Sequence, residues 1–93
     1  MKITLIIDKM NPLYCDDEMM FLTVAYQVNY LSDLLKKQGY IYTNLIYEIF
    51  RVVWNPKFDN NVFLYENFEK FSYICEKNID NGSFIVTIKG ESR

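Results

Sequence analysis

Alternating hydrophobic and polar positions mark the first element of the chain. In the stretch KITLIID, Ile3, Leu5 and Ile7 fall on one face of an extended strand. Thr4 and Ile6 occupy the other face, and most of these residues are β-branched or aliphatic. Since such residues favour pleated surfaces, we expect a first strand with both faces at least partly covered.

Residues 17 to 38 have the periodicity of a long helix. Asp16 is a suitable N-cap, and Gly39 can adopt the left-handed conformation that ends many helices. Acidic residues in the first turn and lysines in the last turn suit the helix dipole. At 100° per residue, one apolar stripe forms the predicted core face. This stripe consists of Phe21, Val24, Ala25, Val28, Leu31 and Leu35.

The same helix has a second apolar side, away from the predicted core face. It consists of Leu22, Tyr26, Tyr30 and Leu34. Tyr26 and Tyr30 lie one helical turn apart, so their rings are neighbours on the helix surface. The helix therefore has more apolar perimeter than one core requires.

A second helix is predicted from Thr43, a candidate N-cap, to about Val53. Its predicted core face consists of Leu45, Ile49 and Val52, with Ile46 and Val53 beside it. A second apolar side consists of Tyr47, Phe50 and Trp54. The short connection of residues 39–42 predicts a tight turn between the two helices.

The last third of the chain holds two predicted strands around an ambiguous segment. NVFLY, residues 61–65, and SFIVTIK, residues 83–89, both have the pattern of strands. Residues 66–77 place apolar residues at both helical and alternating spacing, and we favour a helix because of their glutamates and lysine. The pair Asn81-Gly82 is typical of a hairpin turn. Phe84, Val86 and Ile88 share one face of the last strand.

This order of elements predicts one compact domain, residues 1–93, of the α+β class. We expect a small antiparallel sheet of about three strands with two to three helices packed on one face. The composition agrees with a folded chain, since 51% of the residues are hydrophobic and 17% are aromatic.

Charge and hydropathy disfavour several classes of partner. The net charge is −2, and Lys36-Lys37 is the only adjacent basic pair, which disfavours direct binding to nucleic acid. No apolar stretch approaches the roughly 20 residues that span a bilayer. The apolar start, ITLII, is too short for a signal peptide. We therefore expect a cytoplasmic protein without a membrane partner.

The residue types also disfavour catalysis. The chain has no histidine, and Cys15 and Cys75 lie far apart without a CxxC motif, which predicts reduced thiols and no zinc site. Its three glycines are isolated, so no loop is suited to hold a phosphate. Asp8, with the acidic run 16–18, could supply oxygen ligands for Mg²⁺, but such sites need a larger parallel sheet. We expect no catalytic residue, no metal and no cofactor.

The surplus apolar surface on the two helices has three explanations: packing inside the domain, self-association as a two-fold dimer, or binding of another protein. Tyrosine and tryptophan are enriched at the centres of interfaces. Met19 and Met20 would add adaptable contacts next to this surface. The expected partner-binding residues are Leu22, Tyr26, Tyr30, Leu34, Tyr47, Phe50 and Trp54.

The stretch QVNYLSDLLKKQGYIYTNLIYEIF, residues 27–50, resembles a group of short uncharacterised proteins from bacteriophages and mobile elements of low-GC Gram-positive bacteria. The similar features are a Q-V-N-Y-L helix, a basic-Gly-Tyr corner and an N-x-x-Y second helix. A Trp/Asn/Pro loop, a V-F-L-Y strand and an I-V-T-I strand follow in a similar order. The resemblance implies a product that acts inside a bacterial host cell, where small acidic proteins of this kind commonly bind other proteins, host defence nucleases included.

The resulting expectation is a non-catalytic protein-interaction module of phage or mobile-element type. Its more specific form is an inhibitor of a host bacterial defence protein, similar in role to an anti-CRISPR protein. The alternative is a homodimeric structural or assembly accessory protein. An enzyme is the least favoured class.

Overall fold

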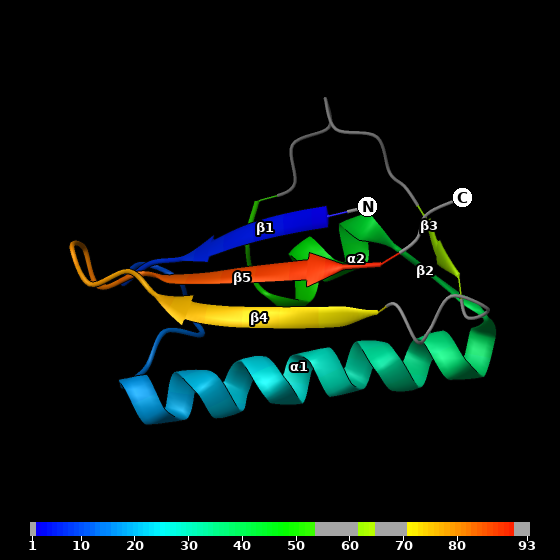
Figure 1. Cartoon of the computed structure of the whole chain (residues 1–93), viewed down its shortest axis with the longest axis horizontal. Coiled ribbons are helices and arrows are strands. Elements are labelled where there is room, and N and C mark those ends of the chain that lie inside the picture. The colour runs from blue at the N-terminus through cyan, green and yellow to red at the C-terminus, as the bar shows by residue number, and fades with distance from the viewer. Residues whose placement is uncertain (1, 54–61, 65–70, 91–93) are drawn as a thin grey trace.

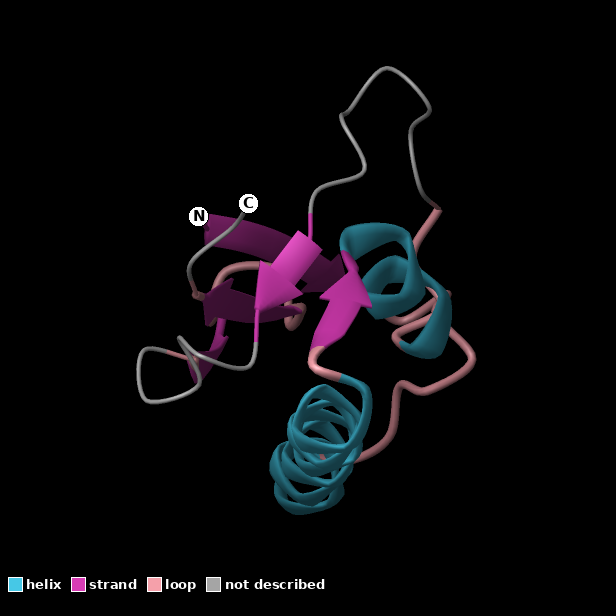
Figure 2. Cartoon of the chain, turned by 90° about the vertical axis from the view of Figure 1, so that its right-hand side faces the viewer, coloured by secondary structure: helices cyan, strands magenta, loops and turns pink. Residues whose placement is uncertain are grey.

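The computed structural model describes residues 2–53, 62–64 and 71–90. Its strands β1, β5 and β4 form an antiparallel sheet in that order, while β2 and β3 form a separate antiparallel pair. Both helices lie on the same side of the three-stranded sheet (Figures 1 and 2). This confirms the predicted α+β class, with two helices in the described part of the chain. The elements are β1 Lys2–Ile7, α1 Asp17–Gln38, β2 Tyr40–Tyr42, α2 Thr43–Ile49, β3 Val62–Leu64, β4 Ser72–Lys77 and β5 Phe84–Lys89.

Strand alternation divides the three-stranded sheet into a buried inner face and an exposed outer face. The inner face buries Ile3, Leu5, Ile7, Phe84, Val86 and Ile88. The outer face is open, with the side chain of Ile6 59% exposed. The expectation that both faces of β1 are at least partly covered holds for the inner face, whereas the outer residues of β1 are exposed, because both helices pack on the inner side.

The ends of α1 agree with the sequence. The carboxylate of Asp16 accepts a hydrogen bond of 3.1 Å from the backbone N–H of Met19. Gly39 has a φ of 83°, and its N–H donates to the carbonyl of Leu35. A left-handed glycine costs little there, because it has no Cβ to clash with the preceding turn.

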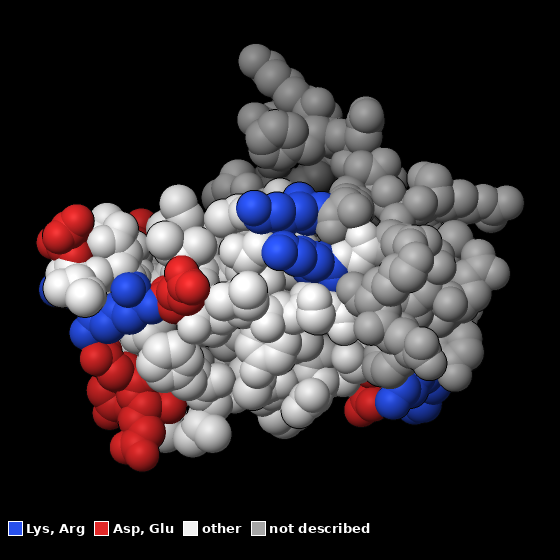
Figure 3. Space-filling view, viewed as in Figure 1, with Lys and Arg blue, Asp and Glu red and all other residues white. Residues whose placement is uncertain are grey.

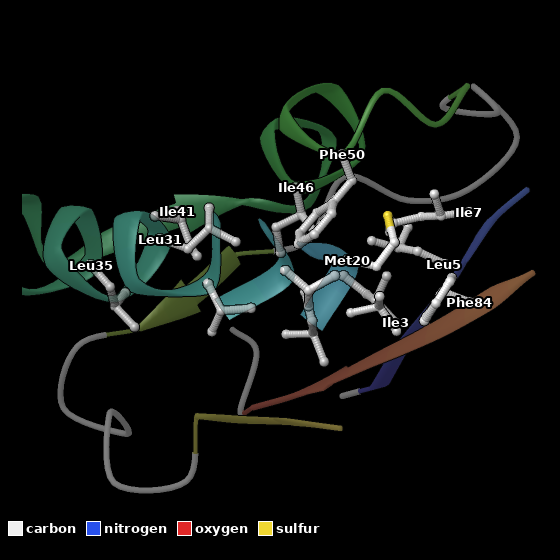
Figure 4. Close-up of a cluster of buried hydrophobic side chains, with 14 residues drawn as sticks. Ile3, Leu5, Ile7, Met20, Leu31, Leu35, Ile41, Ile46, Phe50 and Phe84 are labelled. Atoms are coloured by element: carbon white, nitrogen blue, oxygen red, sulfur yellow. The ribbon is translucent and has the colours of Figure 1, made fainter. Parts of the chain in front are cut away.

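The buried side of α1 is rotated from the predicted stripe towards Met20. Its buried residues are Met20, Val24, Val28, Leu31 and Leu35 (Figure 4). Phe21 stays exposed and contacts Phe84 edge-on, with ring centroids 5.5 Å apart, and Ala25 is half-buried. Met20 is fully buried, so its expected role as a partner contact is wrong.

The segment after α1 differs from the expected turn between helices. Residues 40–42 form β2, which pairs with β3 through partners such as Ile41 and Phe63. Thr43 lies inside α2 and is buried, while Tyr42 occupies the N-cap without a side-chain cap hydrogen bond. The strand forms because distant residues supply its backbone partners, which local spacing could not reveal.

α2 is shorter than predicted and buries a different side. It ends at Ile49, and Arg51 has a left-handed φ of 56° that helical backbone cannot accommodate. Ile46 and Phe50 are fully buried and point into the core (Figure 4). The predicted core face is wrong in detail: Leu45, Ile49 and Val52 pack against the core but are half-buried, and Val53 is exposed.

Residues 72–77 form a strand, so the helix favoured for that part of residues 66–77 is wrong; residues 66–70 lie outside the described residues. β4 and β5 make the hairpin that Asn81-Gly82 predicts, with Cys75 opposite Val86. Gly82 has a φ of 74°, and its N–H donates to the carbonyl of Asn78 over 2.8 Å. Pairing with β5 outweighs the local helical preference, because it satisfies the backbone of the whole segment.

Alanine variants of two leucines on α1 test which side of the helix contributes to the free energy of unfolding. Leu31 is fully buried, and its replacement by alanine is expected to lower the free energy of unfolding by about 2–5 kcal/mol, measured by urea denaturation. Leu22 is the matched control on the exposed side, and L22A is expected to change that free energy by less than about 1 kcal/mol. Equal costs for the two variants would contradict this assignment of the core face.

Candidate protein-binding surface on the first helix

The side of α1 opposite the core exposes three large side chains on successive turns. Leu22 is 60% exposed, Tyr26 is 74% exposed and Tyr30 is 48% exposed. We call these three residues the tyrosine face. They are fixed to a well-capped helix of 22 residues, so the backbone beneath them is already ordered. Leu34, expected on the same surface, is half-buried and packs against the core instead.

A groove of about 320 Å³ lies next to the tyrosine face, between α1 and the end of α2. It is lined by Leu13, Tyr26, Gln27, Tyr30, Glu48, Ile49 and Arg51. Leu13 and Ile49 supply aliphatic surface, whereas Glu48 and Arg51 add one charge of each sign. The groove can therefore receive an apolar side chain of a partner, while its charged residues hydrogen-bond to polar groups of the partner beside that side chain.

The side chain of Asn11 fixes the far wall of this groove. Its amide Nδ2 donates to the carbonyl of Phe50 over 3.0 Å and to the carbonyl of Arg51 over 3.3 Å. Its Oδ1 accepts from the backbone N–H of Leu13 over 2.8 Å. One asparagine thus joins the loop before α1 to the end of α2, where orphan carbonyls need donors.

Further contacts anchor the same loop to the sheet. The hydroxyl of Tyr14 donates to the carbonyl of Gly82 over 2.9 Å, and its ring contacts Phe84 edge-on. At the start of α1, Lys77 of β4 forms an ion pair of 2.7 Å with Asp17. The hydrogen bond to Asp17 also raises the pKa of the Lys77 ammonium group above its ordinary value.

The residues expected on the second helix do not extend the tyrosine face. Phe50 is fully buried, so it cannot take part in a contact surface and its expected role is wrong. Tyr47 is half-buried and packs against the core, and Trp54 lies outside the described residues. Sequence periodicity did not identify Leu13, Gln27, Glu48 or Arg51, because the groove depends on the long-range contacts of Asn11.

Two of the described aspartates, Asp8 and Asp16, hydrogen-bond to nearby backbone N–H groups, and neither cysteine is in a disulfide. Asp8 accepts from the N–H of Met10, Asp16 caps α1, and the region described contains no cluster of three or more His, Cys, Asp or Glu side chains arranged to hold a metal. Cys15 and Cys75 are free and half-buried. Burial raises the pKa of the Cys75 thiol, and the negative charge of Glu76 raises it further. Its thiolate, the nucleophilic form, is therefore disfavoured near neutral pH.

Comparison with known protein families, curated proteins and solved structures finds no match for this chain. In the part of the chain that the structure describes, neither helix combines the length and apolar character that crossing a membrane requires.

The cause assigned to the Cys75 pKa can be tested by alkylation kinetics. In a Cys15→Ser background, E76Q removes a negative charge and is expected to lower the pKa of Cys75. The thiolate fraction at pH 8 then rises, and reaction with iodoacetamide becomes faster. Glu18→Gln, which removes an exposed carboxylate from α1, is the control and leaves the rate unchanged. A slower reaction of E76Q would contradict the assigned cause.

Proposed function

We propose that this protein is a non-catalytic protein-interaction module of phage or mobile-element type. Its contact surface is the tyrosine face together with the adjoining groove. In the more specific form of the proposal, the bound protein belongs to a host bacterial defence system and is inhibited by the contact. The partner is then another protein, held without cofactor or metal.

The exposure of the tyrosine face is the observation that supports this proposal most strongly. Packing inside the domain was the main alternative for these residues, yet Tyr26 keeps three quarters of its surface exposed. A tyrosine ring buries a large area on binding, while its hydroxyl remains tolerable in water before binding. Such residues dominate the binding energy of many interfaces.

The rigidity of the site also supports recognition. The tyrosine face lies on α1, and hydrogen bonds from Asn11 hold the opposite wall of the groove. A partner would therefore have little chain to order on binding, and more of the contact energy would appear as affinity. Arg51 and Glu48 at the groove can orient a partner through complementary charges.

The mobile-element context supports the more specific form. It rests on the resemblance of residues 27–50 to short proteins of phages and mobile elements. A protein of this size can block a larger enzyme by covering a substrate channel or an activation surface. A small rigid face with two tyrosines is suited to that role, because a few anchors contribute most of the binding energy of an interface.

The proposal is tested by quantitative affinity capture from lysates of low-GC Gram-positive bacteria. The double variant Tyr26→Ala/Tyr30→Ala is expected to reduce recovery of a specific partner about tenfold or more, since two contact anchors are removed. The matched control is Tyr40→Ala/Tyr42→Ala, which removes two exposed tyrosines from β2, outside the tyrosine face. This control is expected to recover the partner as the unaltered chain does.

The same variants distinguish recognition from packing. Both doubles are expected to keep the circular dichroism spectrum and melting temperature of the unaltered chain. Full recovery of the partner by Tyr26→Ala/Tyr30→Ala would contradict the proposed surface. Unfolding of that variant, with the control folded, would instead assign the tyrosines to the core.

A further inference from the structure

The two edges of the three-stranded sheet differ in how they are covered. β4 runs beside α1, and Lys77 near its end is paired with Asp17 of that helix (Figure 1). β1, at the opposite edge, pairs with β5 on one side only. No strand in the described ranges pairs with its other side, so a row of backbone N–H and C=O groups faces outward there.

β1 lacks the features that usually prevent pairing at an open edge. Proteins commonly protect such edges with proline, a bulge or a charge in the middle of the strand. The six residues of β1 pair with β5 in unbroken register from Lys2 to Ile7, and the only charge within the strand lies at its first residue. Most of the rest are β-branched, which favours further pairing.

The charges at the two ends of β1 are complementary under a two-fold rotation. Lys2 and Asp8 each lie three residues from Leu5, one on each side. An antiparallel copy with Leu5 opposite Leu5 places Lys2 opposite Asp8 at both ends of the paired strands. Lys2 is exposed and has no ion-pair partner among the described residues. One oxygen of Asp8 accepts from Met10, and the carboxylate has further lone pairs available.

The same register also matches the side chains. It places Ile3 opposite Ile7 on the buried face and Thr4 opposite Ile6 on the outer face. Residues of the buried face in one copy therefore lie opposite residues of the buried face in the other copy. A shift by one residue would break this agreement between faces. In Figure 3, the outer face near the strand is mainly uncharged, with basic side chains towards one end.

A hollow of about 250 Å³ lies at the Asp8 end of this edge. It is lined by Ile6, Asp8, Met10, Asn11, Pro12, Arg51, Val52 and Val53. Met10 and Val53 are largely exposed, so the hollow presents apolar surface together with two charged groups, the carboxylate of Asp8 and the guanidinium of Arg51. The aliphatic stem of a lysine can cover this apolar surface while its ammonium group reaches the carboxylate of Asp8.

We propose that β1 pairs with β1 of a second copy of this chain, antiparallel and with the two-fold axis at Leu5. The two three-stranded sheets then form one continuous six-stranded sheet, with Lys2 of each copy paired with Asp8 of the other. α1, which carries the tyrosine face, lies along the opposite edge of the sheet (Figure 1), so pairing through β1 leaves the tyrosine face open in both copies. The dimer is independent of the proposed function and would present two recognition faces, which strengthens binding to a multivalent target.

The test is sedimentation equilibrium of the full chain over a wide range of concentration. The unaltered protein is expected to reach twice the 11.2 kDa mass of one chain. Lys2→Glu or Asp8→Lys turns two attractive pairs into two repulsive ones and is expected to raise the dimer dissociation constant about tenfold or more. The double variant Lys2→Glu/Asp8→Lys restores the attraction and is expected to recover the dimer.

Lys37→Glu is the matched control, since it makes the same charge change at an exposed position of α1. It is expected to leave the dissociation constant unchanged. A monomer at every concentration would overturn the proposal. A dimer whose dissociation constant is unchanged by the Lys2 and Asp8 variants but raised by Tyr26→Ala would also overturn the proposal. That result would assign self-association to the tyrosine face.

Disulfide trapping tests the register directly. In chains whose Cys15 and Cys75 are replaced by alanine, a Thr4→Cys chain mixed with an Ile6→Cys chain is expected to form a cross-linked pair on oxidation. Each chain oxidised by itself is expected to cross-link far less, because its two thiols are offset by two residues along the strands. Equal cross-linking in all three samples would overturn the proposed register.

Discussion

Burial of one side of α1 against the inner face of the three-stranded sheet is the interaction on which the rest of the structure depends. Met20, Val24, Val28, Leu31 and Leu35 belong to one buried cluster with the apolar residues of β1 and β5, and each fully buried aliphatic side chain contributes about 1.5–3 kcal/mol. A chain of 93 residues has room for one such core. A straight helix can turn only one side towards it, so the opposite side of α1 faces solvent.

The two proposed contact surfaces follow from this arrangement. The tyrosine face is the side of α1 that the core leaves uncovered, and α2, held by Asn11, completes the adjoining groove. The helix lies beside β4, and no strand in the described part of the chain pairs with the outer side of β1. The position of α1 thus explains why the tyrosines are accessible.

The sequence predicted what local chemistry determines. Asp16 and Gly39 set the limits of α1, and Asn81-Gly82 marked the hairpin between β4 and β5. Prediction from the sequence was wrong where the local structure depends on residues that are distant along the chain. β2 exists because β3 pairs with it, residues 72–77 are a strand because β5 pairs with them, and the groove depends on a contact between Asn11 and Phe50, 39 residues apart. Tyr26 and Tyr30 were identified because helical periodicity alone separates them from the core.

Hydroxyl-radical footprinting of the tyrosines, in the free protein and in complex with its captured partner, tests the central claim most directly. The account predicts that Tyr26 and Tyr30 react readily in the free protein and become protected in the complex, while Tyr40 and Tyr42 keep their reactivity. A complex in which Tyr26 and Tyr30 react as they do in the free protein would contradict the claim that the exposed side of α1 is the recognition surface.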